Sequence, residues 1–279
     1  MILANALTHL RPNQSLRAFS ARVGVDRRSL AALEAGNGTL ETVNRVAAAL
    51  DLYLFPHPRY LRNKRRHLGL GLRSMPVDKR TLQALESTGS ARVESYEAVC
   101  AALDERPELR PVTVPWYTPK PLLDAMLTGL GIDQFDLDPA SPAPPTVPTA
   151  AYYTEQDGGL WLPWEGRTVY CNPPYSEMIP WTLKALAEVA TGRAERLLFL
   201  IPYRPETRTH RWLLEADSRF LILDKRVTFG GRKYHLDSAS ALVCFGLTDT
   251  EFRSLAATLP PCHELSMSRV TTMDQEAVI

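Results

Sequence analysis

The chain has 279 residues, of which 45% are hydrophobic and 23% are charged, and these proportions are typical of globular proteins with a packed core. Its length corresponds to about two domains. No run of 18 apolar residues occurs, and residues 1–20 lack a basic start followed by an apolar segment, which argues against a transmembrane helix and a secretory signal. We therefore expect a cytoplasmic protein that does not enter a membrane.

The four cysteines, Cys100, Cys171, Cys244 and Cys262, are widely spaced and form no C-x-x-C pair. This spacing argues against a zinc finger or ribbon and against a disulfide-stabilised scaffold, and it is ordinary for a protein of a reducing compartment. We expect no metal site.

The net charge of +1 conceals a difference between the two halves of the chain. Residues 1–110 contain 17 Lys and Arg against 11 Asp and Glu, a charge of +6, whereas residues 111–279 contain 15 against 20, a charge of −5. A basic half joined to an acidic half suggests that the N-terminal half meets a polyanion and that the C-terminal half has another task.

A segment of the N-terminal half occurs twice. Gly24-Val-Asp-Arg-Arg-Ser-Leu-Ala-Ala-Leu-Glu34 returns as Pro76-Val-Asp-Lys-Arg-Thr-Leu-Gln-Ala-Leu-Glu86, and after one inserted residue the segment ending at Asp51 matches the segment ending at Asp104. Both copies are apolar at helical spacing. The self-similarity therefore predicts two copies of one helical unit, which we place at residues 1–57 and 58–110.

Each copy also carries signals for short helices. Asp26 and Asp78 are predicted N-caps, and Gly36 and Gly89 are predicted C-terminal stops. In the first copy, these signals predict a leading helix at Ser15 to Val23, a turn at Gly24-Val25 and a second helix at Arg27 to Glu34.

This pattern resembles the helix-turn-helix of phage-repressor-like DNA-binding proteins, whose second helix enters the major groove. The second copy fits less well, because its leading helix would read Leu68-Gly-Leu-Gly-Leu72 and each glycine costs a helix about 1 kcal/mol. We therefore expect a degenerate second repeat.

The resemblance implies double-stranded DNA as a partner, and the positions of the two repeats that we expect to be exposed indicate which side chains would contact it. Residues of the second helices suited to base edges are Arg27, Arg28, Lys79, Arg80 and Gln83. Residues suited to phosphate contacts lie between the copies and are Arg62, Lys64, Arg65 and Arg66. The alternative is a helical domain whose charged face binds protein.

Beyond prolines 107, 111 and 115 the pattern changes from all-helix to alternation, so we assign residues 111–279 to a further domain. Predicted strands lie at 135–138, 167–171, 196–201, 220–223 and 239–246, and predicted helices at 121–130, 181–190 and 210–216. This alternation predicts an α/β fold with a mostly parallel sheet, whose ligands bind at the carboxyl ends of the strands.

The most informative motif is Asn172-Pro173-Pro174-Tyr175, directly after a predicted strand. Two prolines hold the backbone extended without donors, so the Asn172 side chain and the Pro173 carbonyl can both accept hydrogen bonds from one exocyclic amine. That arrangement aims the nitrogen lone pair at an electrophile, and Tyr175 offers a flat face to a planar ring. The motif is typical of amino-methyltransferases, which use S-adenosylmethionine.

Neighbouring segments extend this likeness. Trp116-Tyr-Thr-Pro119, Phe135-Asp-Leu-Asp-Pro-Ala-Ser141, Asp157-Gly-Gly-Leu160 and Cys171-Asn-Pro-Pro-Tyr-Ser176, followed by Lys225-Arg-Val-Thr-Phe229, occur in an order that resembles the phage-type DNA N6-adenine methyltransferase family. The resemblance spans about residues 114–247. It implies a Rossmann-like methyltransferase sheet, S-adenosylmethionine as cofactor and DNA as substrate.

The resemblance also implies roles for single residues. Thr118 and Pro119 would hold the carboxylate of the cofactor, Asp138 and Pro139 its ammonium, and Asp157 its adenosine part, with Trp161 or nearby apolar residues packing on its ring. Asn172, Pro173, Pro174 and Tyr175 would bind the target base. The alternative reading of Thr118, Asp138 and Asp157 is helix or turn capping.

Alternative functions stay open at this point. The same chemistry could act on cytosine N4 or on a protein glutamine, although cytosine-N4 enzymes more often carry Ser-Pro-Pro-Trp. A non-catalytic DNA-binding regulator with a vestigial methyltransferase domain is another possibility, because Asp138 is followed by no glycine-rich turn. The phage-type family also lacks that turn.

The favoured reading is an adenine-specific DNA methyltransferase of a bacterial or phage-infected cell, guided by its helix-turn-helix repeats. Its target adenine would have to rotate out of the duplex, at a cost of a few kcal/mol. The internal repeat could take the place of a second subunit, so the sequence leaves the oligomeric state open.

Overall fold

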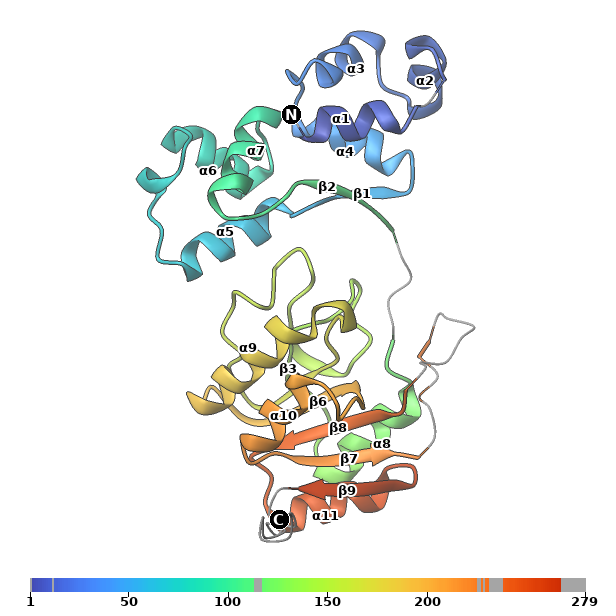
Figure 1. Cartoon of the computed structure of the whole chain (residues 1–279), viewed down its shortest axis with the longest axis vertical. Helices are drawn as coiled ribbons and strands as arrows, with labels where there is room; N and C mark the ends of the chain where they lie inside the picture. Colours follow the sequence, from blue (N-terminus) through green and yellow to red (C-terminus); the bar gives the residue numbers. More distant parts are fainter. Residues whose placement is uncertain are drawn as a thin grey trace, which may run out of the picture. The chain divides into compact units, whose positions relative to one another are not determined.

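The computed structural model describes residues 2–11, 13–112, 117–224, 227, 229–230 and 238–266. The chain forms two compact units (Figure 1). The first contains the chain up to residue 113 together with residues 156–162, and the second contains the remainder. Both predicted repeats, 1–57 and 58–110, therefore lie in the first unit. No helix in the described ranges has the length and apolar character that crossing a membrane requires.

The first repeat forms the helices that its signals predict. They are α1 (Ile2–His9), α2 (Leu16–Val23), α3 (Arg27–Glu34) and α4 (Leu40–Ala48). Ser15 and Asp26 accept hydrogen bonds from the first turns of α2 and α3, which satisfies donors that the helix itself leaves unpaired. Gly24 ends α2 with a left-handed φ of 66°, a conformation that glycine adopts without steric cost.

The second repeat departs from the first at its leading helix. Its elements are α5 (Pro58–His67), the 3-10 turn η1 (Leu72–Ser74), α6 (Lys79–Thr88) and α7 (Val93–Ala102). No α-helix forms at 68–72, where the two glycines disfavour one, and η1 begins at the last residue of this segment. Gly69, with a φ of 68°, and Gly71 interrupt this segment.

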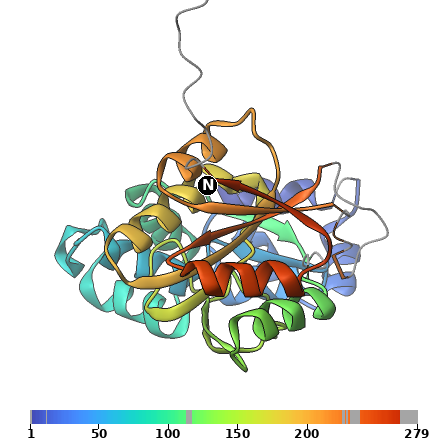
Figure 2. The ribbon, with the colours of Figure 1, turned by 90° about the horizontal axis from the view of Figure 1, so that it is seen from below.

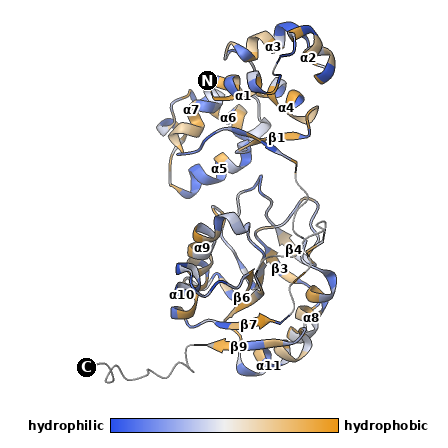
Figure 3. Ribbon diagram, turned by 45° about the vertical axis from the view of Figure 1, so that its right-hand side comes forward, coloured by the Kyte–Doolittle hydropathy of each residue, from blue (hydrophilic) through white to orange (hydrophobic). Residues whose placement is uncertain are grey.

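The two repeats share one apolar core. Equivalent side chains of α3 and α6 are fully buried in it, namely Leu30 and Leu33 with Leu82 and Leu85. Each repeat is followed by a short strand, β1 (Leu52–Phe55) or β2 (Glu108–Pro111), and these strands pair antiparallel. In Figure 3 the ribbon of α5 is coloured mostly as hydrophilic.

The second unit is built on a seven-stranded sheet in the order β4-β3-β5-β6-β8-β7-β9. Its strands are β3 (Phe135–Asp138), β4 (Thr149–Tyr152), β5 (Gly166–Cys171), β6 (Ala194–Pro202), β7 (Arg219–Leu223), β8 (Ser240–Phe245) and β9 (Cys262–Ser266). The predicted α/β class is confirmed. The sheet is mixed, because β8 and β9 run opposite to the other strands, and the expectation of a mostly parallel sheet is wrong for these two.

Helices cover both faces of this sheet (Figure 2). On one face α8 (Lys120–Leu130) lies beside α11 (Asp249–Thr258), and on the other lie α9 (Met178–Ala190) and α10 (Arg208–Glu215). The strand β6 is buried through most of its length, because both of its faces are covered, and this accounts for its continuous apolar sequence.

Close contact between α8 and α11 depends on Gly129. A Cβ atom at this position would lie 2.5 Å from Thr258 Oγ1 and 2.7 Å from Leu255 Cα. Because one of these atoms belongs to the α11 backbone, the contact cannot be relieved by rotating a side chain.

We predict that Gly129→Ala lowers the free energy of unfolding by about 1–2 kcal/mol, since overpacking costs about 1–3 kcal/mol and the helix propensity of alanine returns up to about 1 kcal/mol. Denaturant unfolding measures this change. The control is Thr128→Ala on the exposed side of α8, for which stability should be unchanged or higher. An equally stable Gly129→Ala variant would show that the two helices can separate at little cost.

Candidate functional site

The predicted site residues of the second unit gather at one edge of the sheet. Asp138 ends β3 and Asn172 follows β5, and these strands are adjacent and parallel, with Leu137 paired to Val169. The carboxyl ends of parallel strands meet at the same sheet edge, where α/β proteins bind ligands. The pairing of these strands therefore places Asp138 and Asn172 at the same edge of the sheet.

Thr118 joins this edge through hydrogen bonds. It lies just before α8, for which Pro119 is the N-cap residue, and it is buried. Its Oγ1 lies 2.7 Å from the hydroxyl of Tyr170 and accepts a hydrogen bond of 3.3 Å from Nδ2 of Asn172. These hydrogen bonds join three side chains into one network, although Thr118 and Asn172 are 54 residues apart in the sequence.

Sequence reasoning missed Tyr170. It appeared only as an apolar residue of the predicted strand at 167–171. In the structure it is fully buried, and its ring stacks on Phe135 at 5.1 Å between centroids. Burial raises the pKa of its hydroxyl well above the usual range, and the charge of Asp138 adds to this effect, so the hydroxyl remains protonated and able to donate.

Asp138 is a buried carboxylate with an exposed fraction of 2%. Burial raises its pKa to about 7, opposed in part by hydrogen bonds from the Ala140 N–H and from Ser141. Among the described residues it forms no ion pair. The following Pro139 is buried, and the backbone N–H of Tyr153 donates to the Asp138 carbonyl at 2.9 Å. The carboxylate is therefore held in a fixed position where a cation would relieve its desolvation.

The Asn172–Tyr175 segment turns directly from β5 into the 3-10 turn η2 (Tyr175–Glu177). Pro173 is buried and Pro174 exposed. The Tyr175 ring meets the edge of Phe229 at 6.1 Å between centroids. Burial raises the pKa of its hydroxyl, which argues for a role of the ring rather than of an ionised oxygen.

Phe229 reaches this place because the next residue pairs with the chain that leads to α8. The N–H of Gly230 donates to the Tyr117 carbonyl at 2.9 Å. The other motif residues Trp116, Lys225, Arg226 and Thr228 lie outside the described residues.

The strand β8 brings a further polar residue to the edge, which the sequence did not single out. Ser240 begins β8 and pairs with Pro202 at the carboxyl end of β6. It is fully buried, and its hydroxyl has no hydrogen-bond partner among the residues that the structure describes. A polar ligand at this edge would satisfy it.

Asp157 belongs to the first unit. Its carboxylate forms an ion pair of 2.7 Å with Arg59 of α5, and its carbonyl accepts from Asn63 Nδ2 at 2.8 Å. In the same segment Trp161 packs edge-on to Tyr60, with Lys64 Nζ 4.8 Å from its ring centroid. The cofactor role that the resemblance implies for Asp157 and Trp161 stays a prediction.

The predicted base-reading side chains are exposed. They are Arg27 and Arg28 in the first turn of α3, and Lys79, Arg80 and Gln83 on α6. The four cationic members form no ion pair among the described residues, so their charge faces solvent.

The predicted phosphate contacts divide into two kinds. Arg66 is exposed and Arg62 partly exposed. The prediction is corrected for the other two residues, because Lys64 is buried against Glu105 at 2.5 Å and Arg65 is buried against Glu86 at 2.6 Å. The basic composition of this run does not by itself distinguish inward from outward positions, and here Lys64 and Arg65 are neutralised by internal carboxylates.

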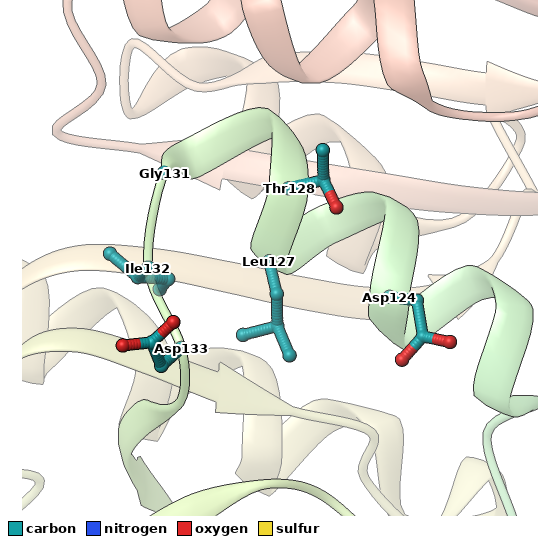
Figure 4. Close-up of a pocket in the computed structure, with 6 residues that line it drawn as sticks. All are labelled: Asp124, Leu127, Thr128, Gly131, Ile132 and Asp133. Carbon is teal, nitrogen blue, oxygen red and sulfur yellow. The ribbon is translucent and has the colours of Figure 1, made fainter.

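One hollow of the second unit lies apart from this edge of the sheet. An open pocket of about 420 Å³ lies at the C-terminal end of α8, lined by residues from Asp124 to Asp133 (Figure 4). It precedes β3 and therefore lies at the amino edge, away from the site. No group of His, Cys, Asp and Glu in the described part of the chain is arranged to hold a metal ion.

The difference between Arg65 and its neighbour can be tested. We predict that Arg65→Gln lowers the free energy of unfolding by about 3–5 kcal/mol, because it leaves the Glu86 carboxylate buried without its partner. Arg66→Gln is the matched control and should change it by less than about 0.5 kcal/mol. Urea unfolding of both variants measures these changes. Equal free energies of unfolding for the two variants would show that Arg65 is not part of the internal structure.

Comparison with known proteins finds a family match within the second half of the chain. Residues 109–242 match the family described as DNA N-6-adenine-methyltransferase (Dam). The matched range includes Thr118, Asp138, Asp157 and the Asn172–Tyr175 motif. A search of curated proteins finds no match.

Proposed function

We infer that the chain methylates the N6 amine of adenine in DNA, because residues 109–242 form a domain of the DNA N6-adenine methyltransferase (Dam) family. Enzymes of this family use S-adenosylmethionine, which supplies the methyl group as an electrophilic carbon on a sulfonium. The observation that carries the assignment of residues is the hydrogen bond from Asn172 to Thr118 at the carboxyl edge of the sheet.

This hydrogen bond sets the polarity of Asn172. Because Nδ2 of the amide donates to Thr118, the other end of the amide presents its oxygen, which is the acceptor that an amine N–H requires. Tyr170 in turn holds Thr118 in place at 2.7 Å. We propose that Asn172 Oδ1 and the Pro173 carbonyl accept the two N–H groups of the adenine amine and direct its lone pair.

Tyr175 would hold the ring of the same base. Its ring is kept in place by the edge contact with Phe229, and stacking of a base on an aromatic side chain is worth about 1–3 kcal/mol. That gain offsets part of the cost of rotating the base out of the duplex. The buried hydroxyl of Tyr175, whose pKa is raised, does not act as a base in this scheme.

Asp138 fits the ammonium of the cofactor. A carboxylate that is buried without a cationic partner among the described residues is stabilised by a bound cation, and its raised pKa reports the cost of its present surroundings. Ser240, whose buried hydroxyl lies at the same edge, adds hydrogen-bonding capacity. Thr118 and Pro119 would lie against the carboxylate of the cofactor, and Pro139 would line its site.

The first unit would supply affinity for the duplex as a helix-turn-helix. Three residues, Gly24 to Asp26, separate α2 from α3, a spacing that this motif commonly shows. The exposed cations of α3 and α6 would meet the major groove, and Arg62 and Arg66 the phosphates.

The central experiment measures N6-methyladenine by nucleoside mass spectrometry after incubation of the full chain with S-adenosylmethionine and mixed-sequence duplex DNA. Asn172→Ala should lower the methylation rate at least about 100-fold, since the amine loses its positioning acceptor. Ser176→Ala, an exposed neighbour in the same loop, is the control and should retain activity. Methylated cytosine in place of adenine, or DNA binding without any methylated base, would overturn the proposal.

Asp138 should make cofactor binding depend on pH. Only the ionised carboxylate pairs with an ammonium, and its pKa is about 7, so affinity should rise by up to about tenfold per pH unit toward pH 7 and then level off. Calorimetric titration with S-adenosylmethionine between about pH 5.5 and 7.5 measures this. Asp138→Asn should bind more weakly and lose the dependence, whereas Asp133→Asn should behave like the parent chain. An unchanged profile in Asp138→Asn would exclude this role.

A further inference from the structure

The two repeats of the first unit meet through a reciprocal pair of backbone hydrogen bonds. The N–H of Leu40 donates to the Ala91 carbonyl at 3.0 Å, and the N–H of Val93 donates to the Gly38 carbonyl at 2.9 Å. In the repeat alignment Val93 is the equivalent of Leu40, and Ala91 is the equivalent of Gly38. Between these bonds, the equivalent residues Thr39 and Arg92 form an antiparallel bridge.

Such reciprocity is the mark of a two-fold relation. When the same donor position in each copy bonds the same acceptor position in the other, the contact is isologous, as in a symmetric dimer. Copies related by simple translation would place equivalent backbones parallel rather than antiparallel. The first unit therefore has an internal pseudo-two-fold axis that passes between Thr39 and Arg92, and the antiparallel pairing of β1 with β2 agrees with it (Figure 1).

Side-chain interactions repeat across this axis. Arg11 forms a two-pronged ion pair with Glu34, the last residue of α3, and Arg65 forms the same pair with the equivalent Glu86 of α6. The N-caps correspond too, since Asp26 binds Ser29 and Asp78 binds Thr81. The helices α3 and α6 are thus held in equivalent settings, although α2 has only η1 as its counterpart.

The symmetry places two equivalent basic helix ends on one chain. Arg27 and Arg28 begin α3, and Lys79 and Arg80 begin α6, all exposed. The next outward position differs, with Ala31 in α3 and Gln83 in α6. Arginine and lysine read guanine, glutamine reads adenine, and alanine contacts the thymine methyl group.

We propose that a single chain binds a duplex site of two inverted half-sites, with the internal axis on the dyad of the DNA. The half-sites would agree where Arg28 and Arg80 reach the bases and differ where Ala31 and Gln83 reach them. This proposal rests on the proposed function of the first unit in binding duplex DNA. Charge complementarity and the known DNA substrate class of the family support DNA as the occupant.

In the test, the full chain is used without cofactor to select the duplexes that it binds from a pool of random sequences. The enriched sequences should contain two half-sites in inverted orientation, and the mass of the complex in solution should correspond to one chain per duplex. Reversing one half-site to a direct repeat, with the spacing kept, should weaken binding at least about tenfold.

Two double variants test which helix, α3 or α6, contacts which half-site. The double change Arg27→Ala and Arg28→Ala should erase the preference in one half, and Lys79→Ala with Arg80→Ala the preference in the other. Arg253→Ala, an exposed arginine of the second unit, controls for the loss of positive charge and should keep both preferences. Enrichment of a direct repeat or a single half-site, or two chains on one inverted site, would overturn the inference.

The methylation assay separates the two proposals. N6-methyladenine formed on DNA without any inverted preference would leave the enzyme assignment intact and overturn the two-fold reading. Absence of both methylation and binding to duplex DNA would overturn the proposed function and the inference with it.

Discussion

The hydrogen bond from Asn172 to Thr118 is the constraint on which the proposed chemistry depends. It joins the segment before α8 to the end of β5, and Tyr170 secures it from within the core. An amide that is free to rotate offers a donor and an acceptor to any neighbour. With its nitrogen engaged by Thr118, Asn172 has its oxygen at the opposite end of the amide, so the fold holds the amide in one orientation before any ligand binds.

Much of the second unit followed from periodicity. Strands were predicted at 135–138 and at 167–171, where short segments with apolar residues alternate with helical ones, and their carboxyl ends gave the position of Asp138 and Asn172. Tyr170 could not be found this way, since a tyrosine in such a run looks like core. The reversed direction of β8 and β9 also escaped prediction, because strand direction depends on connections that periodicity does not report.

The first unit shows where composition misleads. Basic residues of α5 suggested a phosphate-binding run, yet Lys64 and Arg65 face inward to Glu105 and Glu86. The periodicity of α5 could have separated inward from outward positions, whereas the carboxylate partners are 21 and 41 residues away along the chain. Pairing over such separations is a tertiary property. The same limit applies to the two-fold axis, for which the repeat gave equivalence of residues but not the direction of their contact.

The chain path argues against treating the two units as separable modules. Residues 156–162 have their contacts in the first unit, yet the chain continues from them on both sides into the second unit, toward β4 and β5. Cutting the chain near residue 111 would remove Arg59 and Asn63, the residues that bind Asp157. A fragment that begins there would lose these contacts even if the first unit had no part in DNA binding. Surface substitutions on α3 and α6, which leave these contacts intact, are therefore the cleaner measure of what the first unit contributes.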